Sequence, residues 1–163
     1  MLTVEKIGGT SMSQFDQVLK NIIIGNRKAG EYYNRIFVVS AYNNVTNWLL
    51  EHKKTKEPGI YSRFAEGKDY NAALNELLEK LLAINKTFEN IGLDLKIADN
   101  FIKTRIAQTK NYLNSLADAM ATGYISKENI LLAAREILAS IGEAHSAFNS
   151  VNILQNNNIN SKF

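Results

Sequence analysis

Apolar residues recur along much of the chain at intervals of three and four, the spacing that buries one face of a helix. The first such stripe predicts a helix from Ser13 to about residue 28, with Gly30 ending the element; its members are Phe15, Val18, Leu19, Ile22 and Ile23. Ser13 and Asp16 resemble a capping box, with Asp in place of the usual Glu or Gln.

Two longer stripes follow in the middle of the chain. They cover residues 70–90 and 93–120 and are separated by Gly92, so they predict an antiparallel helical hairpin. The first stripe consists of Leu74, Leu77, Leu78, Leu81, Leu82 and Ile84, and the second includes Leu95, Phe101, Ile102, Ile106, Leu113 and Leu116.

Shorter helices are predicted on both sides of this hairpin. One runs from Val45 to about Lys54 and precedes a turn at 56–59, which holds the single proline. Another opens at Ser126 and ends near Ser140. A separate helix begins at Gly142-Glu143 and ends in the polar run Gln155-Asn156-Asn157-Asn158.

Three segments have the character of strands. Residues 2–7 predict a short first strand, and the continuous apolar run in 35–40 predicts a second strand, buried on both faces of a parallel sheet. With the helix between them they form a right-handed βαβ unit. Residues 159–163 predict the start of a third strand, so we expect the chain to end inside a fold. The predicted class is α/β and helix-rich, with few parallel strands.

Composition excludes several functional classes. The 163 residues include 45% apolar and 21% charged residues, as in ordinary globular proteins. The formal charge of +3 is dispersed, which argues against a nucleic-acid partner. The densest basic stretch, Lys53, Lys54 and Lys56, is interpreted as a solvated helix end.

Cysteine is absent, which excludes disulfides, thiol catalysis and Cys-based zinc sites and fits a reducing compartment, so we expect a cytoplasmic protein. His52 and His145 have no partner at metal-ligand spacing, so no metal site is predicted. Neither a signal peptide nor an apolar run long enough to span a membrane is found, so no membrane partner is expected.

The segment from Lys6 to Ser11, Lys-Ile-Gly-Gly-Thr-Ser, lies where the first strand gives way to a helix. Gly8 and Gly9 allow close backbone approach to a ligand and positive φ angles, and the exposed N–H groups suit an anion. Lys6 adds a point charge, and the hydroxyl groups add donors. The spacing matches neither a Walker A loop nor a dinucleotide fingerprint. In isolation, a glycine turn with an exposed lysine explains the segment somewhat better than a phosphate site does.

Taken with later segments, this motif resembles the aspartokinase family. Lys6-Ile-Gly-Gly-Thr-Ser is similar to the family's opening Lys-Phe-Gly-Gly-Thr-Ser, and Val38-Val-Ser-Ala41 to the end of its second strand. Val45-Thr46-Asn47 is similar to the continuation after that strand, and Ser140-Ile-Gly-Glu-Ala-His-Ser146 to its Gly-Glu-x-x-Ser segment. The elements occur in the family's order over essentially the whole chain, which covers less than half of a typical aspartokinase. Residues 42–54 most resemble the branch found with ectoine biosynthesis.

The resemblance implies a fold, a reaction and a set of site residues. The chain would be the N-terminal part (1–163) of an amino-acid kinase catalytic domain, a carbamate kinase-like three-layer fold. The enzyme would transfer the γ-phosphoryl group of ATP, with Mg²⁺ bound through the nucleotide phosphates, to the side-chain carboxylate of L-aspartate. The product, 4-phospho-L-aspartate, would serve lysine, threonine and methionine or ectoine biosynthesis. Lys6 would be catalytic, the ATP phosphates would lie against Lys6, Ile7, Gly8, Gly9 and Ser11, and aspartate against Ser40, Thr46 and Glu143.

Such a site is chemically sensible, because the acceptor carboxylate is already ionised at neutral pH and needs no general base. Positioning and charge neutralisation then do most of the catalysis. The sequence departs from the family at Ile7, usually Phe, and at Asn43 and Asn44, where the family has glycine at one or both positions; Asn tolerates left-handed φ best among the other residues. The later catalytic half and the regulatory ACT domains are not found, so little or no activity is expected from this chain alone.

Structural explanations of the same residues stay open at this stage. Glu143 could be a carboxylate favoured at a helix N-terminus, and Ser40 and Thr46 could cap the helix after the loop. Ser146 has a structural and a functional interpretation of similar weight. Tyr42 and Trp48 are interpreted as packing residues.

Two alternative functions stay open as well. A kinase of the same fold could use another acceptor, such as glutamate. The chain could also be a non-catalytic helical module that binds a ligand or a protein. Because an incomplete sheet exposes an apolar face or edge, such a module would tend to self-associate.

Overall fold

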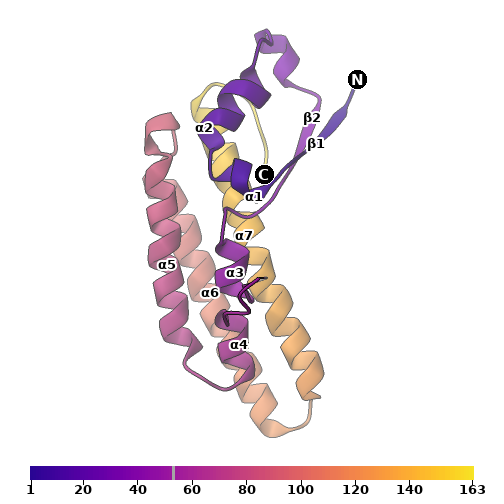
Figure 1. Ribbon diagram of the computed structural model, residues 1–163, viewed down its shortest axis with the longest axis vertical. Helices are drawn as coiled ribbons and strands as arrows, with labels where there is room; N and C mark the ends of the chain where they lie inside the picture. The colour runs from indigo at the N-terminus through magenta and orange to yellow at the C-terminus, as the bar shows by residue number, and fades with distance from the viewer. Residues whose placement is uncertain (53) are drawn as a thin grey trace.

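Three long helices run side by side along the molecule, and a small sheet lies at one end of them (Figure 1). The computed structural model describes residues 1–52 and 54–163; Lys53, in the predicted basic stretch, lies outside the described residues. The long helices are α5 (Tyr70–Thr87), α6 (Leu95–Thr122) and α7 (Lys127–Asn156). The predicted helical hairpin is thus confirmed as α5 and α6, and α7 packs against α6.

Local sequence signals account for the ends of these helices. Asp69, Asp94 and Ser126 each occupy an N-cap, where the side chain accepts a hydrogen bond from a backbone N–H of the first turn. Gly123 follows the end of α6 with a φ angle of 72°, and Gly92, with a φ of 103°, ends the short 3₁₀ helix that comes after α5; glycine adopts both angles without strain. The predicted stripes face inward, and fully buried members include Leu74, Leu81, Ile102 and Leu113.

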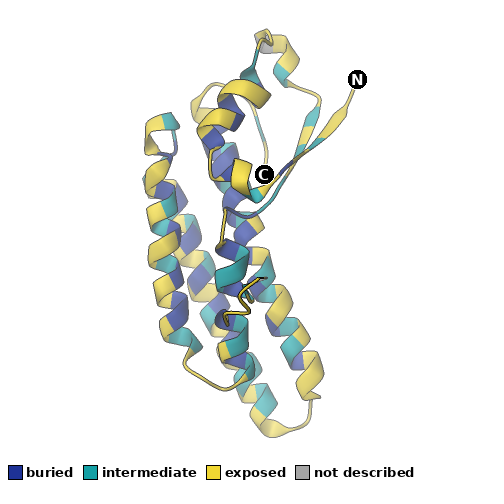
Figure 2. Cartoon of the chain, in the orientation of Figure 1, coloured by how far each residue is buried: buried dark blue, intermediate teal, exposed yellow. Residues whose placement is uncertain are grey.

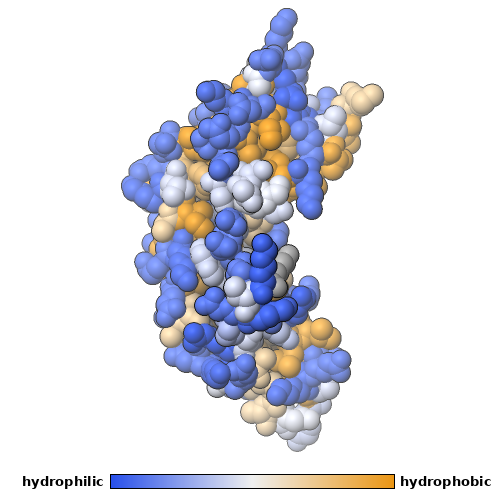
Figure 3. Space-filling model, in the orientation of Figure 1, coloured by the Kyte–Doolittle hydropathy of each residue, from blue (hydrophilic) through white to orange (hydrophobic). Residues whose placement is uncertain are grey.

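The sheet consists of two parallel strands, β1 (Thr3–Ile7) and β2 (Arg35–Val39), paired from Thr3↔Arg35 to Ile7↔Val39. Both predicted strands are confirmed. The prediction that β2 is buried on both faces is wrong, because Ile36 and Val38 are 48% and 50% exposed. Along β2, intermediate residues alternate with exposed ones (Figure 2). Figure 3 shows apolar surface on this end of the molecule.

The connection between the strands differs from the single helix predicted. It consists of the short helices α1 (Gly9–Met12) and α2 (Phe15–Gln17), the π-helix η1 (Val18–Ile24) and the 3₁₀ helix η2 (Ala29–Tyr32). The helical segment ends at Gly25, at a φ of 51°, and not at residue 28.

Ser13 does not form the predicted capping box. Its hydroxyl donates to the carbonyl oxygen of Gly9 at 3.2 Å and accepts from the backbone N–H of Asn43 at 2.8 Å. Tertiary contact with the loop after β2 therefore replaces the local cap.

A buried arginine attaches the sheet to this connection. Arg35 donates to both carboxylate oxygens of Glu5 at 2.7 and 2.8 Å and to the carbonyl oxygens of Ile22 and Ile23. Its side chain is only 5% exposed, and the bonds from Arg35 lower the pKa of Glu5 below the usual range. One side chain thus joins β1, β2 and η1.

Short helices continue the chain along the side of α7. The helix predicted from Val45 to about residue 54 ends earlier, since α3 spans Val45–Leu49 and an antiparallel bridge then pairs Glu51 with Pro58. At Gly59 a Cβ atom would lie 2.6 Å from the carbonyl oxygen of Leu50, so only glycine fits this return. The helix α4 (Ile60–Ala65), which was not predicted, follows directly.

The C-terminal part departs from prediction in two respects. The break predicted at Gly142 does not occur, because α7 continues through it; the glycine provides space for a neighbouring segment and does not end the helix. Residues 159–163 form no third strand. Ile159 is buried, and Phe163 packs edge-on against the stacked rings of Phe101 and Phe148. Across residues 1–52 and 54–163, we find no helix long and apolar enough to cross a membrane.

Candidate functional site

A cleft of about 440 Å³ opens where the two strands end and the chain turns into the helical layer. Its lining combines the start of α1, the loop after β2 with α3, and one residue of α7: Gly9, Thr10, Ser40, Ala41, Tyr42, Asn43, Asn44, Thr46, Asn47 and Glu143. The carboxyl ends of parallel strands are the usual place for ligands in α/β folds. The cleft therefore occupies the position where a ligand is expected.

Gly9 lies in this cleft because of the close approach of another loop. A Cβ atom at Gly9 would lie 2.7 Å from the carbonyl oxygen of Ala41, so any larger residue would displace the loop after β2. The prediction of positive φ at Gly8 and Gly9 is wrong, since neither has one, and Gly8 is extended with a φ of −77°.

Glu143 comes from the middle of α7 and is exposed toward the cleft. The helix N-terminus explanation of this residue is wrong, because α7 begins at Lys127. The loop approaches closely because Gly142 has no side chain: a Cβ atom there would lie 2.6 Å from the Cβ of Ala41 and 3.2 Å from Cγ1 of Val45. Glu143 is the acidic residue of the lining, and no ion pair to it occurs within the part of the chain that the structure describes.

Ser40 and Thr46 lie in the lining but do not cap α3. The N-cap of α3 is Asn44, which has a left-handed φ of 67°, as the sequence predicted for an asparagine in this loop, and makes no side-chain cap. Ser146 has a structural role, since its hydroxyl donates to the carbonyl oxygen of Ser40 at 2.8 Å. The loop is thereby bonded directly to α7.

The remaining predicted site residues lie outside this lining. Lys6 is exposed on the outward face of β1, Ile7 is buried on the inward face, and Ser11 is exposed on α1. Gly8 is open, with no atom within 4 Å of where its Cβ would be. The structure thus brings together the predicted aspartate residues and Gly9, and leaves the other phosphate residues beside them.

Sequence reasoning missed part of the lining and a buried cluster beneath it. Thr10 faces the cleft where Ser11 was expected, and Asn47 also lines it. Beneath the loop, Tyr42, Asn149 and His145 are joined in a polar network with side chains of α5 and α6. Burial lowers the pKa of His145 to about 4 and raises that of Tyr42. No local pattern marks these residues, because their partners are distant in sequence.

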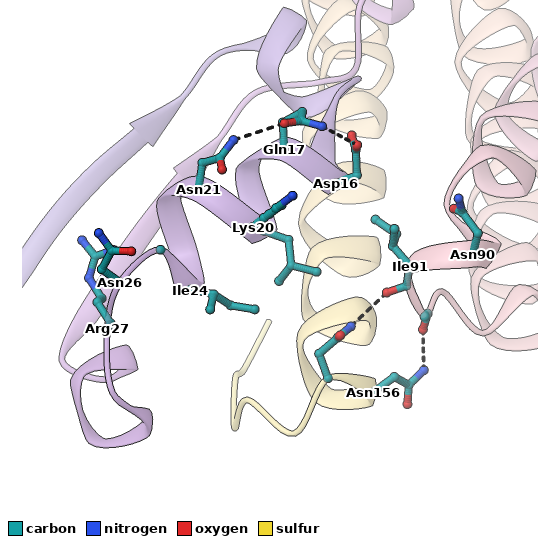
Figure 4. A pocket seen from close by; sticks show the side chains of 14 residues that line it. Asp16, Gln17, Lys20, Asn21, Ile24, Asn26, Arg27, Asn90, Ile91 and Asn156 are labelled. Atoms are coloured by element: carbon teal, nitrogen blue, oxygen red, sulfur yellow. Dashed lines mark hydrogen bonds between the residues drawn. The ribbon is translucent and has the colours of Figure 1, made fainter.

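A larger hollow of about 1020 Å³ lies elsewhere, between η1 and the region where η3 (Glu89–Ile91) meets the end of α7 (Figure 4). Two of the amide side chains that line it, those of Asn156 and Asn157, already have backbone partners. Asn156 Nδ2 donates to the carbonyl oxygen of Gly92 at 2.7 Å, and Asn157 Nδ2 donates to that of Ile91 at 2.9 Å. None of the predicted site residues lines it. We therefore interpret it as a gap where secondary-structure elements pack together, and not as the candidate site.

The described residues, 1–52 and 54–163, contain no group of three or more His, Asp or Glu side chains placed to hold a metal ion. No family model matches the chain, and no solved structure matches it. A protein of Stutzerimonas stutzeri (strain A1501), named Aspartate kinase Ask_Ect, is 48% identical over 165 aligned residues. That alignment covers 99% of this chain but only 35% of the relative. The resemblance to aspartokinases is therefore confirmed: over almost its whole length, the chain is homologous to about a third of an aspartate kinase.

Proposed function

We propose that the chain carries part of the active site of an aspartokinase, which transfers the γ-phosphoryl group of ATP to the side-chain carboxylate of L-aspartate. The fold it would belong to is that of the amino-acid kinases. The observation that supports this most strongly is the shared cleft of Gly9, Ser40, Thr46 and Glu143, which are far apart in sequence. The similarity to a protein named aspartate kinase supplies the reaction.

Aspartate suits the chemistry of this lining. The carboxylate of Glu143 would bind the α-ammonium group, and the hydroxyls of Ser40 and Thr46 would donate to a carboxylate of the substrate. The cleft of about 440 Å³ has room for an amino acid beside a phosphate group. A ligand with one ammonium and two carboxylate groups therefore finds both acceptors and donors here.

The phosphates of ATP would lie at the edge of the cleft beside Gly8, Gly9 and Ser11. The open space at Gly8 leaves room for phosphate oxygens, and Lys6, exposed two residues before it, would approach them. Mg²⁺, bound through those oxygens, would neutralise phosphate charge. No side chain of this chain is assigned to it.

Phosphoryl transfer at such a site needs no proton. A side-chain carboxylate oxygen of aspartate attacks the γ-phosphorus and forms the new O–P bond. The bond from that phosphorus to the β–γ bridging oxygen breaks, and ADP leaves with the electron pair. Lys6 would stabilise the charge on the transferred group, while Glu143, Ser40 and Thr46 would hold the acceptor in line.

Because the chain spans about a third of the relative, the first test is binding. Isothermal titration calorimetry with the 163-residue chain should show L-aspartate binding that Glu143→Gln weakens about tenfold or more, as expected for loss of a charged hydrogen bond. Glu136→Gln, an exposed residue earlier on α7, is the matched control and should bind as the wild type does. Equal loss in both variants, or stronger binding of L-glutamate than of L-aspartate, would contradict the assignment.

Turnover is tested by a hydroxamate assay with Mg-ATP and either amino acid. We expect little product from the chain alone, and any aspartate-dependent product should disappear in Lys6→Ala but persist in Lys28→Ala. Product formation in Lys6→Ala equal to that of the wild type would exclude the catalytic role of Lys6. The pathway supplied, whether for aspartate-family amino acids or for ectoine, is proposed from the resemblance alone.

The exposed sheet face favours a second candidate function, that of a module that binds protein. Val4, Ile36 and Val38 form an aliphatic outward face on two strands. Such a face favours self-association. Light scattering should then show dimers or larger species, which Val38→Lys reduces; a monodisperse wild-type monomer would count against this function.

A further inference from the structure

A buried polar cluster lies beneath the loop that lines the candidate cleft. It consists of Tyr42 from the loop after β2, Asn85 from α5, Asp99 from α6, and His145 and Asn149 from α7. Asn85, His145 and Asn149 are completely inaccessible to solvent. Because buried polar groups are costly when unpaired, such a network favours one relative arrangement of the elements that contribute to it.

The directions of the hydrogen bonds follow from Asp99. A carboxylate accepts, so Asn85 turns its Nδ2 toward Asp99 at 2.8 Å and its Oδ1 toward the interior. That oxygen accepts from Asn149 Nδ2 at 2.8 Å and lies 2.7 Å from Nε2 of His145. Nε2 of His145 therefore carries a proton and donates it to Asn85, and burial, which lowers the pKa of His145 to about 4, keeps the ring neutral at pH 7.

The second proton of the Asn149 amide connects this network to the loop. Asn149 Nδ2 donates to the hydroxyl of Tyr42 at 3.2 Å. The ring of Tyr42 also packs against those of Phe88 and His145, with its centroid 5.3 Å from the centroid of each. Tyr42 is therefore anchored on both its polar and its apolar sides.

Above this anchor, the backbone of the same loop forms the floor of the cleft. The carbonyl oxygen of Tyr42 accepts from Val45 N–H at 3.1 Å, and Asn43 N–H donates to the Ser13 hydroxyl at 2.8 Å. Any movement of Tyr42 would therefore move the segment that carries Ser40 and Thr46 relative to Glu143.

We propose that this network positions the candidate substrate loop. Tyr42, Asn85 and Asn149 are positioning residues that fix residues 40–46 against α7. The helical hairpin of α5 and α6 thereby becomes part of the support of the site, although none of its side chains lines the cleft. The ligand named in the test, L-aspartate, rests on the proposed function; the positioning itself does not.

The test measures loop order and ligand binding separately in the 163-residue chain. Tyr42→Phe removes only the hydroxyl that joins loop and network, and Asn85→Ala removes the central amide. The matched controls are Tyr112→Phe, an exposed tyrosine on α6, and Asn75→Ala, an exposed asparagine on α5. Thermal unfolding establishes that each variant is folded at the temperature of measurement.

Loop order is measured by hydrogen exchange at the backbone amides of Ser40, Asn43 and Val45, and binding by calorimetry with L-aspartate. We expect exchange at these amides to be about tenfold faster in both network variants, the effect of losing one buried hydrogen bond, with binding weakened by a similar factor. The controls should change neither quantity.

Unchanged exchange at these amides in a folded Tyr42→Phe protein would overturn the proposal, even if the melting temperature falls, because the network would then hold only the helices. If Asn85→Ala fails to fold, Tyr42→Phe alone decides. If the wild type does not bind L-aspartate, the binding arm refutes the proposed function, and the exchange arm still decides whether the network orders the loop.

Discussion

The helical bundle and the sheet end of the molecule are stabilised in different ways. The bundle of α5, α6 and α7 packs aliphatic side chains between long helices whose starts are capped locally. The sheet end has two short strands, a π-helical crossover and an aliphatic outer face open to solvent. Buried apolar side chains such as Met12, Phe15 and Ile23 join it to the common core. Polar bonds from Ser146 and Asn149 of α7 to Ser40 and Tyr42 add to this attachment.

This difference separates stability from function. All residues assigned to the candidate cleft, apart from Glu143, belong to the sheet end, to the loop that joins it to α3, or to α3 itself. The bundle contributes most of the fully buried aliphatic side chains and thus most of the hydrophobic stabilisation. We therefore expect substitutions in the bundle to unfold the whole chain, and substitutions at the sheet end to loosen the site first.

The largest effect is expected from Leu113→Ala, in the center of the bundle on α6. Leu113 is completely buried, so its truncation should lower the free energy of unfolding by about 3 kcal/mol. Urea denaturation measures this, and backbone amides of the bundle and the sheet should lose protection together. Leu132→Ala, at an exposed leucine of α7, is the control and should cost less than about 0.5 kcal/mol. A Leu113→Ala protein in which only the sheet unfolds would contradict the expectation that substitutions in the bundle unfold the whole chain.

Acid pH should also lower the stability of the bundle, because His145 is buried in its neutral form. Burial holds the pKa of His145 at about 4 against 6.5 in an unfolded chain, so between these values the unfolded state binds the extra proton. The contribution of His145 to the free energy of unfolding is fully present above pH 6.5, and the free energy of unfolding falls by about 3 kcal/mol as the pH is lowered to 4. Urea denaturation at several pH values measures the slope, which should be shallower in His145→Gln. Equal flattening in His52→Gln would refute the assignment to His145.

The success of sequence-based prediction follows the same division. The hairpin was predicted to within a few residues because its stripes and glycine ends are local signals. The crossover was mispredicted because Ser13 bonds to Asn43 in another loop. The break predicted at Gly142 failed for a related reason, since the glycine fits a neighbouring segment.

The candidate cleft was predicted in part. Gly9, Ser40, Thr46 and Glu143, which the resemblance assigned to the site, line one cleft, although no local pattern joins them. Their roles in binding stay a prediction. The network beneath it could not be predicted, because Asn85 and His145 are 60 positions apart and look like ordinary helix residues until α5 and α7 are packed.

At the sheet end, Arg35→Met should lower the free energy of unfolding by about 2 kcal/mol. This is less than the loss of a partner costs in a fully buried ion pair, because the side chain of Glu5 is 29% exposed. The loss should be local: amides of β1 and β2 exchange faster, while those of α5 to α7 keep their protection. Arg135→Met, on the surface of α7 where Arg135 lies 3.5 Å from Glu136, is the control and should change little. Equal loss of protection in the bundle would mean that the two regions unfold as one.

The smallest effect is expected where the two regions meet. Gly142→Ala introduces a methyl group 2.6 Å from the Cβ of Ala41, so the loop after β2 must move away from α7. Overpacking destabilises by about 1–3 kcal/mol, but alanine is the better helix former by about 1 kcal/mol, so the net loss should be near 1 kcal/mol.

A measurement of stability alone therefore tests this contact weakly. The sharper measurement is the affinity for L-aspartate by calorimetry. The free energy of binding should fall by more than the free energy of unfolding, because Ser40 and Thr46 shift relative to Glu143. Gly30→Ala, at a glycine with open space around it, is the control. A Gly142→Ala protein that is more stable and binds as the wild type does would show that the loop accommodates the methyl group, and that close contact with α7 is not what shapes the cleft.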